Sequence, residues 1–147
     1  SELRNGKKVE KNKLLQIKRM INFPLSIKLF YNSKFIRRRT LSAGCAICCP
    51  AVTYIKKNAG QSIFDEKYIN SCDYKTWVDL SKKKGAFVYI PQKLLLHRIY
   101  EGSATTLNLS ENIRMKEDYE ILCDLWPRFI AKLVNSFYCK SEKSNQL

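Results

Sequence analysis

The sequence predicts an α/β fold, locally α+β, in which short strands are combined with longer amphipathic helices. Segments rich in β-branched and aromatic residues and bounded by glycine or proline predict strands over 47–55, 86–90 and 93–100. Apolar residues that recur every three or four positions predict helices over 72–84 and from residue 111 toward the C-terminus. The chain has 147 residues, of which 45% are hydrophobic, so it can bury one core of ordinary size.

The region before residue 47 combines a hairpin signal with a basic amphipathic stretch. The pair Asn5-Gly6 lies between short strand-like flanks, which favours a tight hairpin turn. Apolar and basic residues are interleaved from 14 to 35, and Pro24 divides this stretch because proline removes a helical N–H donor. We therefore expect a hairpin followed by two short helical pieces.

Glycine, proline and serine mark the ends of the later elements. The helix over 72–84 ends in a run of lysines followed by Gly85, and Pro91 separates the two strands that come next. Ser110 has the character of an N-cap residue for the helix that follows it. Pro127 should interrupt this helical C-terminal region, so that it restarts there.

Positive charge is concentrated in the first 40 residues. The whole chain has 27 lysines and arginines against 13 acidic residues, a net charge of +14, and residues 1–40 account for +10 of it. Such a region is compatible with a solvated basic face, with an anionic membrane surface or with nucleic acid. Nucleic acid is the least favoured of these, because no helix-turn-helix, zinc-finger or RNP pattern accompanies the charge.

Composition excludes several other classes of protein. Glycine and proline are too scarce for a collagen-like or low-complexity chain, and the apolar share is too high for a disordered one. No run of about 18 apolar residues predicts a membrane-spanning helix, and the first residues do not resemble a signal peptide. These features lead us to expect a cytoplasmic protein.

The cysteines are expected to be free thiols in a cytoplasmic chain. Cys45 and Cys48 form a CxxC pair, but the only histidine is His97, and no second pair of ligands lies at a spacing suited to zinc. We therefore assign no metal ligand. The six cysteines are Cys45, Cys48, Cys49, Cys72, Cys123 and Cys139.

Asp73 is the most informative acidic residue. It stands at the start of the predicted helix over 72–84, four residues before Trp77, where backbone N–H groups would keep its carboxylate ionised. A carboxylate held in this way can act as a base, and the alternative is that it only caps the helix.

The segments around Asp73 follow one another in a specific order. They are Phe64-Asp65-Glu66, Cys72-Asp73, Trp77, Gly85, Val88-Tyr89-Ile90-Pro91 and Arg98-Ile99-Tyr100-Glu101-Gly102-Ser103-Ala104-Thr105. In this order, over about residues 47–106, the chain resembles the C-terminal, acceptor-side part of family 2 glycosyltransferases, which are inverting enzymes with a GT-A fold. Two positions differ from the family pattern: Cys72 stands where an acid is common, and Tyr100 where histidine is usual.

The resemblance implies a role for particular residues. Asp73 matches the catalytic base, which takes a proton from the acceptor hydroxyl as that oxygen attacks the anomeric carbon of a nucleotide-sugar. For several of the substrate-binding candidates a structural role is the alternative: Trp77 could lie in the core, Asp65 and Glu66 could fix a loop, and Arg98 could pair with a carboxylate rather than a phosphate. The candidates are Asp65, Glu66, Cys72, Trp77, Arg98, Tyr100 and Ser103.

The resemblance also implies partners and a cofactor. The partners would be a nucleotide-sugar donor and a glycan or lipid-linked acceptor in surface polysaccharide or glycolipid synthesis, at the inner face of the plasma membrane, with residues 1–40 near the lipid. Family members hold Mg²⁺ or Mn²⁺ with a D-x-D motif, which this sequence lacks; we expect residues 118–120, the nearest match, to form a solvated face.

The expected organisation has three parts. Residues 1–46 form a basic hairpin and amphipathic helical region, 47–106 the acceptor-side part of the transferase, and 107–147 a helical extension with a polar tail. Without the donor side, we expect a fragment that is inactive alone. The alternative function is that of a small basic nucleic-acid-binding module.

Overall fold

Helices dominate this protein in the computed structural model, which describes residues 2–4, 7–9, 13–60, 63–99 and 111–143. Short 3-10 helices occupy Phe23–Ser26, Lys28–Phe30 and Cys49–Ala51. The α-helices are α1 (Lys13–Asn22), α2 (Lys34–Leu41), α3 (Lys56–Ala59), α4 (Cys72–Lys82), α6 (Glu111–Cys123) and α7 (Arg128–Lys143).

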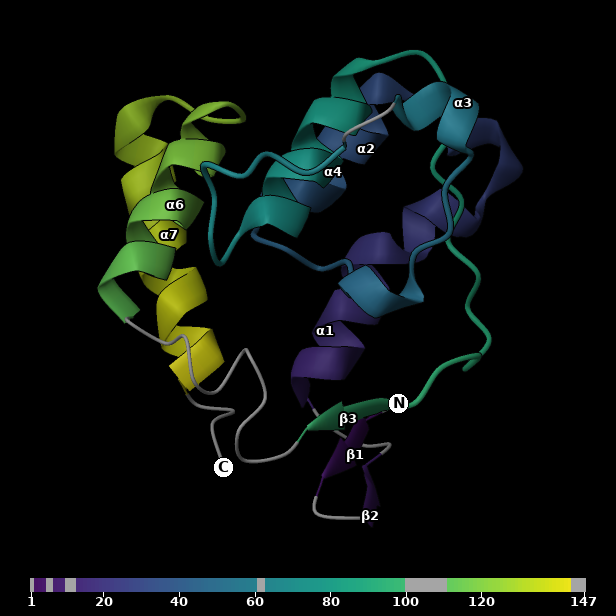
Figure 1. Ribbon diagram of the computed structural model, residues 1–147, viewed down its shortest axis with the longest axis horizontal. Helices are drawn as coiled ribbons and strands as arrows, with labels where there is room; N and C mark the ends of the chain where they lie inside the picture. Colours follow the sequence, from purple (N-terminus) through teal and green to yellow (C-terminus); the bar gives the residue numbers. More distant parts are fainter. Residues whose placement is uncertain (1, 5–6, 10–12, 61–62, 100–110, 144–147) are drawn as a thin grey trace.

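A small sheet lies below the helices in Figure 1. Its strands are β1 (Glu2–Arg4), β2 (Lys7–Val9) and β3 (His97–Ile99), in the order β2-β1-β3. Strands β1 and β2 pair antiparallel, as the hairpin signal predicted, while β1 and β3 pair parallel. The turn residues of the hairpin lie outside the described residues.

The prediction of an α/β GT-A fold was wrong, because no layered sheet is present in the described part of the chain. Each described strand has three residues. The segment predicted as a strand over 47–55 instead contains a 3-10 helix that begins at Cys49, next to Pro50, and is followed by α3. Strand propensity reflects how a side chain fits a pleated surface, so it has little effect where no neighbouring strand supplies one.

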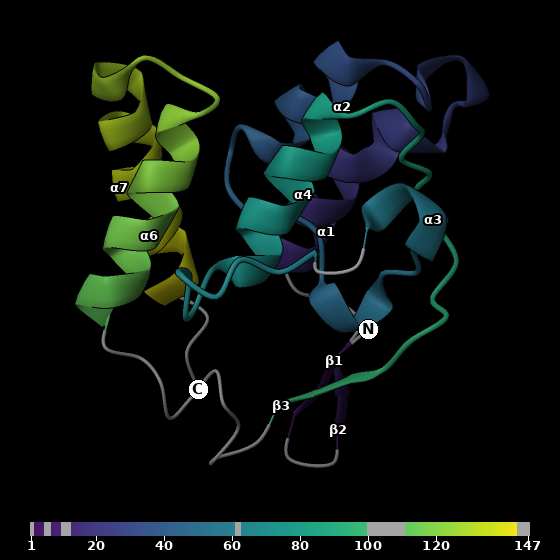
Figure 2. The ribbon, with the colours of Figure 1, turned by 45° about the horizontal axis from the view of Figure 1, so that its top comes forward.

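Several predicted helix boundaries are close to the observed ones. The second helical piece expected before residue 35 is wrong, because 3-10 turns occupy that stretch and α2 begins at Lys34. Helix α1 ends at Asn22, and Pro24 lies in the 3-10 turn that follows it. Helix α4 ends at Lys82, and Gly85 then adopts a φ of 133°, which glycine tolerates best. Pro127 separates α6 from α7, and these two helices run side by side (Figures 1 and 2).

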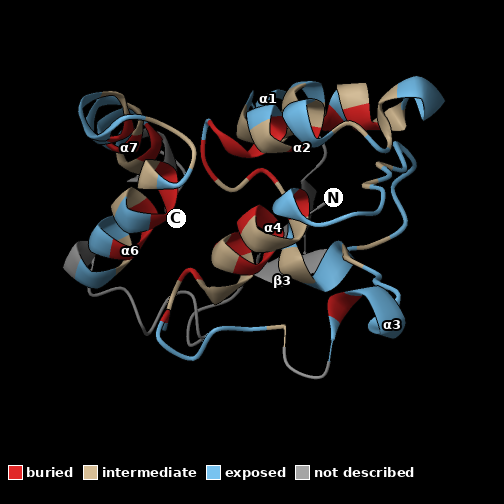
Figure 3. Cartoon of the chain, turned by 90° about the horizontal axis from the view of Figure 1, so that it is seen from above, coloured by how far each residue is buried: buried red, intermediate tan, exposed pale blue. Residues whose placement is uncertain are grey.

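Helix α4 lies at the centre of the core. Its residues Tyr74, Trp77 and Val78 are buried against Leu41 of α2 and the pair Ile121-Leu122 of α6. The Tyr74 hydroxyl also donates a hydrogen bond of 2.6 Å to the Leu41 carbonyl oxygen. Buried residues gather where these helices face one another (Figure 3). Among the described residues, no helix combines the length and apolar character that crossing a membrane requires.

Two neighbouring carboxylates of α6 hold the chain just before α4, and we call Glu117 and Asp118 the α6 clamp. The Glu117 carboxylate accepts hydrogen bonds from the backbone N–H groups of Ile69, Asn70 and Ser71, at 2.8, 3.0 and 2.9 Å. The Asp118 Oδ1 atom accepts a 2.7 Å bond from the Ser71 hydroxyl. The clamp therefore accepts hydrogen bonds from backbone N–H groups just before α4 that have no acceptor within the helix.

The α6 clamp corrects the expectation of a solvated face over residues 118–120. Asp118 is only 2% exposed, and Glu117 beside it is 8% exposed. Glu120 does lie at the surface, where it forms a 3.0 Å ion pair with Lys67. Acidic neighbours on one helix thus differ in burial, because successive side chains point in directions about 100° apart.

Replacing Glu117 by glutamine should lower the free energy of unfolding by about 2 kcal/mol. The amide presents an NH₂ group to backbone N–H donors, so charge-assisted hydrogen bonds are lost while the side chain keeps its shape. Urea denaturation followed by circular dichroism measures the change. Glu120→Gln is the matched control on the same helix and should leave the unfolding midpoint almost unchanged. Equal effects of the two substitutions would contradict a role for the clamp.

Candidate functional site

Asp73 lies in the first turn of α4, as the sequence predicted. Its Oδ1 atom accepts a 2.7 Å hydrogen bond from the backbone N–H of Tyr74. The N-cap residue, Ser71, forms no capping bond with its side chain, since its hydroxyl donates to Asp118 instead. Asp73 therefore does contribute to capping, and it is also half-buried at a defined position.

The electrostatic expectation for Asp73 requires correction. Burial raises the pKa of the Asp73 carboxyl above its ordinary value, and this effect is larger than the lowering by the Tyr74 N–H group, Arg114 and Lys18. The N–H groups at the start of α4 favour the ionised carboxylate, but the loss of water on burial outweighs them. A raised pKa suits a general base, because such a group works best when its pKa approaches the working pH.

Three thiols share the surroundings of Asp73. Burial raises the pKa of Cys45, Cys49 and Cys72, and the negative charge of Asp73 raises each of them further. The Cys45 Sγ atom donates to the carbonyl oxygen of Ile47 at 3.3 Å. These groups are therefore protonated near neutral pH, so the Asp73 carboxylate faces neutral sulfur rather than thiolate.

The thiol environment does not favour a metal or redox role for the CxxC pair. Cys45 is half-buried, Cys48 is exposed, and all six cysteines are free. The part of the chain that the structure describes holds no group of three His, Cys, Asp or Glu side chains that could bind a metal ion. The described residues thus do not form a site for the Mg²⁺ or Mn²⁺ implied by the family resemblance.

The other predicted site residues are dispersed. Asp65 and Glu66 are exposed in the loop before α4, where Asp65 Oδ1 accepts a local 3.0 Å bond from the Lys67 N–H. Cys72 is half-buried next to Asp73. Trp77 is 3% exposed, and its Nε1 atom has no hydrogen-bond partner in the described structure. The burial of Trp77 agrees with the alternative that this residue lies in the core, and it leaves little of the ring accessible to a substrate.

The remaining predicted residues follow residue 96. Arg98 lies in β3, where the structure describes the backbone but not this side chain. Tyr100 and Ser103 lie outside the described residues.

Sequence reasoning did not identify the groups that set the charge balance around Asp73. Lys18 comes from α1 and Arg114 from α6, and both lower the pKa of Asp73. Each lies more than 40 positions from Asp73 in the sequence, so no local pattern connects them. In the sequence, these two residues cannot be distinguished from ordinary surface charges, because only the packing of the helices brings them near Asp73.

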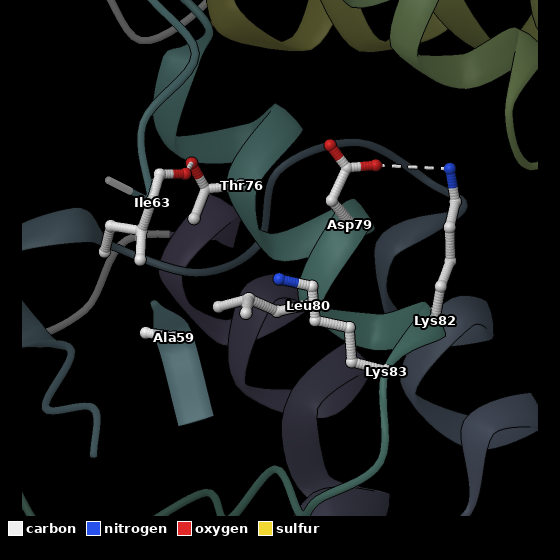
Figure 4. Close-up of a pocket in the computed structure, with 7 residues that line it drawn as sticks. All are labelled: Ala59, Ile63, Thr76, Asp79, Leu80, Lys82 and Lys83. Carbon is white, nitrogen blue, oxygen red and sulfur yellow. Dashed lines mark hydrogen bonds and ion pairs between the residues drawn. The ribbon is translucent and has the colours of Figure 1, made fainter. Parts of the chain in front are cut away.

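A separate pocket of about 440 Å³ lies beside the later turns of α4 (Figure 4). The Thr76 hydroxyl there donates a 2.8 Å bond to the Ile63 carbonyl oxygen, and Lys82 pairs with Asp79 at 3.2 Å. None of the site residues predicted from the sequence lines this pocket. The lining residues are Ala59, Ile63, Thr76, Asp79, Leu80, Lys82 and Lys83.

Comparisons of the chain with protein-family models, with curated proteins and with solved structures found no match. Functional inference therefore depends on the residues of this chain.

The raised pKa of Asp73 predicts a specific dependence of stability on pH. A carboxyl whose pKa is higher in the folded state contributes stability below its unfolded pKa of about 4, and this contribution is lost as pH rises through the folded pKa. Asp73→Asn stays neutral and keeps an oxygen for the Tyr74 N–H. The stability of the wild type relative to this variant should therefore fall as the pH rises from about 4 through the folded-state pKa of Asp73.

Urea denaturation of both proteins across this pH range measures the difference, and acid effects on other groups cancel in the subtraction. A relative stability of the wild type that rises with pH would show that the pKa of Asp73 is lowered rather than raised.

Alkylation rates provide an independent test of the thiol environment. With iodoacetamide near neutral pH, exposed Cys48 should react first and Cys45 slowly, because only the thiolate reacts. Asp73→Asn should accelerate modification of Cys72 a few-fold, since the charge that raises its pKa is removed. Cys139 on α7 is the internal control. Peptide mass spectrometry gives each rate, and an unchanged rate at Cys72 would show that Asp73 does not influence it.

Proposed function

We propose that Asp73 is the general base that activates a sugar-acceptor hydroxyl in an inverting glycosyl transfer from a nucleotide-sugar. The observation that carries this proposal is a half-buried carboxylate with a raised pKa at the first turn of α4. The order of the segments from Phe64 to Thr105, which resembles that of family 2 glycosyltransferases, supports the same assignment. The proposal concerns the chemistry of Asp73 and does not require a GT-A sheet.

The proposed step is a single in-line displacement. The Asp73 carboxylate takes the proton of the acceptor hydroxyl while the hydroxyl oxygen forms a bond to the anomeric carbon. The bond from that carbon to the diphosphate oxygen breaks on the opposite face, so the configuration inverts. The products are the glycoside and a nucleoside diphosphate, and Asp73 then returns its proton to water.

The surroundings of Asp73 favour this role in two ways. The α6 clamp fixes the residues immediately before α4, and a base must be held within a few tenths of an ångström of its productive position. The neutral thiols nearby provide little competing hydrogen bonding, which leaves the carboxylate reactive toward a hydroxyl.

We also propose that an anionic lipid surface lies close to the N-terminal helices, where a lipid-linked acceptor would be presented. Residues 13–41 contain no acidic residue and eight basic residues, of which all but the buried Arg37 are exposed or half-buried. Large apolar side chains are exposed in the same stretch: Met20 is 74% exposed, Leu29 83% and Phe35 66%. Basic and apolar groups that are exposed together are the combination that binds anionic membrane interfaces.

Acceptor binding tests the proposed function directly. The full chain, labelled with ¹⁵N, should bind at least one member of a panel of glycans and glycolipid headgroups, with amide shifts at residues 72–74. Asp73→Asn should weaken this binding by about ten-fold or more, because it loses a charge-assisted hydrogen bond. Asp79→Asn, on the same helix but in the separate pocket, is the matched control and should retain the affinity.

Two results would contradict this function. The first is a complete panel without binding, or binding that Asp79→Asn weakens as much as Asp73→Asn does. The second is tight binding of a random oligonucleotide with a steep dependence on salt, which would favour the nucleic-acid alternative.

A further inference from the structure

The segment from Ala86 to Ile90 has the form of a β-strand without a partner strand. Two of its N–H groups donate to carbonyl oxygens of an earlier part of the chain: Phe87 to Tyr31 at 3.0 Å, and Tyr89 to Leu25 at 2.8 Å. Phe87 and Tyr89 are half-buried, whereas Ala86, Val88 and Ile90 are exposed. This alternation with a period of two is the geometry of a strand with one covered face.

The other edge of this segment is open. In an extended chain the backbone groups of successive residues point to opposite edges, so those of Val88 and Ile90 point away from Tyr31 and Leu25. No hydrogen bond to Val88 or Ile90 is found among the described residues. Their side chains are 53% and 55% exposed. The chain that leads from α4 to β3, teal to green, descends along one side of the molecule in both Figure 1 and Figure 2.

The inner side of the segment is held in place. The Arg37 guanidinium lies 5.3 Å from the centre of the Phe87 ring and donates a 3.1 Å bond to the Lys83 carbonyl oxygen. Arg37 is itself only 1% exposed. A strand that is already extended and anchored loses little entropy when a second strand binds, which favours association.

We propose that residues 86–90 form a docking edge for an extended peptide whose alternating apolar residues are flanked by carboxylates. Backbone hydrogen bonds along the open edge would supply affinity, and Val88 and Ile90 would contact the apolar residues of the peptide. Lys83 and Lys84 are exposed just before the edge, and residues 83–96 contain no acidic residue. Carboxylates of the peptide complement the positive charge at this end of an uncharged edge.

Charge argues against a second copy of this chain as the occupant. Antiparallel pairing of two copies through residues 86–90 would bring Lys83 and Lys84 of one copy near Lys93 of the other. The chain as a whole carries a net charge of +14, so like charges would meet throughout the approach. Edges that avoid pairing usually carry lysine or proline within the strand, and residues 86–90 contain neither, so this edge can accept a partner strand.

Fluorescence anisotropy with labelled peptides tests the docking edge on the full chain. The probe is a short peptide of alternating valine and threonine with two glutamates at each end. It should bind with a micromolar dissociation constant. The same peptide with its alternate amides N-methylated should bind at least about ten-fold more weakly. Methylation removes the backbone N–H groups that would donate hydrogen bonds to the open edge. A peptide with lysines in place of the glutamates should also bind at least about ten-fold more weakly.

Variants locate the peptide on the protein. Val88→Pro removes the N–H group on the open edge and should reduce binding at least about ten-fold, whereas Val88→Thr keeps that group and should retain binding. Circular dichroism establishes that both variants are folded. The N-methylated peptide tests the same point without any change to the protein.

Three outcomes would overturn the proposal. The first is equal binding of the methylated and unmethylated peptides, and the second is equal binding of the lysine and glutamate peptides. The third is a stable dimer of the chain in sedimentation experiments that the Val88→Pro substitution abolishes. The last outcome would make a second copy the occupant of the edge.

Discussion

The rest of the structure depends on how the backbone N–H groups before α4 are satisfied. Those of Ile69, Asn70 and Ser71 precede the helix and cannot bond within it. The Ser71 N–H group is buried and the other two hydrogen bonds are partly buried, so groups left without an acceptor would destabilise the fold. A single carboxylate, Glu117, accepts all three. This arrangement fixes the start of α4, and the start of α4 fixes both the core residues and Asp73.

The burial of Asp73 lowers the stability of the fold when the carboxyl is ionised, but it raises the pKa of the carboxyl toward the range that suits a base. Burial disfavours the ionised carboxylate, while Lys18 and Arg114 offset only part of that cost. A chain selected for stability alone would place a neutral residue at this position. Retaining a half-buried carboxylate among three neutral thiols is more easily understood if the carboxylate reacts with something. The half-buried position of this carboxylate therefore supports the proposed base independently of any likeness to another protein.

The ends of α1, α4 and α6 were predictable from the sequence because their signals are local, whereas α2 and α3 were not predicted over their observed ranges. Pro24, Pro127 and Gly85 mark boundaries by removing a donor or permitting an unusual φ, and these effects operate wherever the chain folds. The strands were not predictable in this way, because a strand forms only where a second strand, often distant in sequence, supplies its hydrogen-bond partners. Residues 86–90 are extended as their composition indicates, yet in the described structure they bond only to isolated carbonyl groups.

The position of Asp73 was predictable for the same local reason, whereas its charge environment was not. The clamp residues lie 46 positions or more from the groups that they bind. That separation also has a consequence for biosynthesis. At about 5–20 residues per second, the ribosome needs several seconds to proceed from Ser71 to Glu117. Until then the apolar face of α4, with Tyr74, Trp77 and Val78, has no α6 to cover it. The nascent chain therefore exposes part of its future core during this interval.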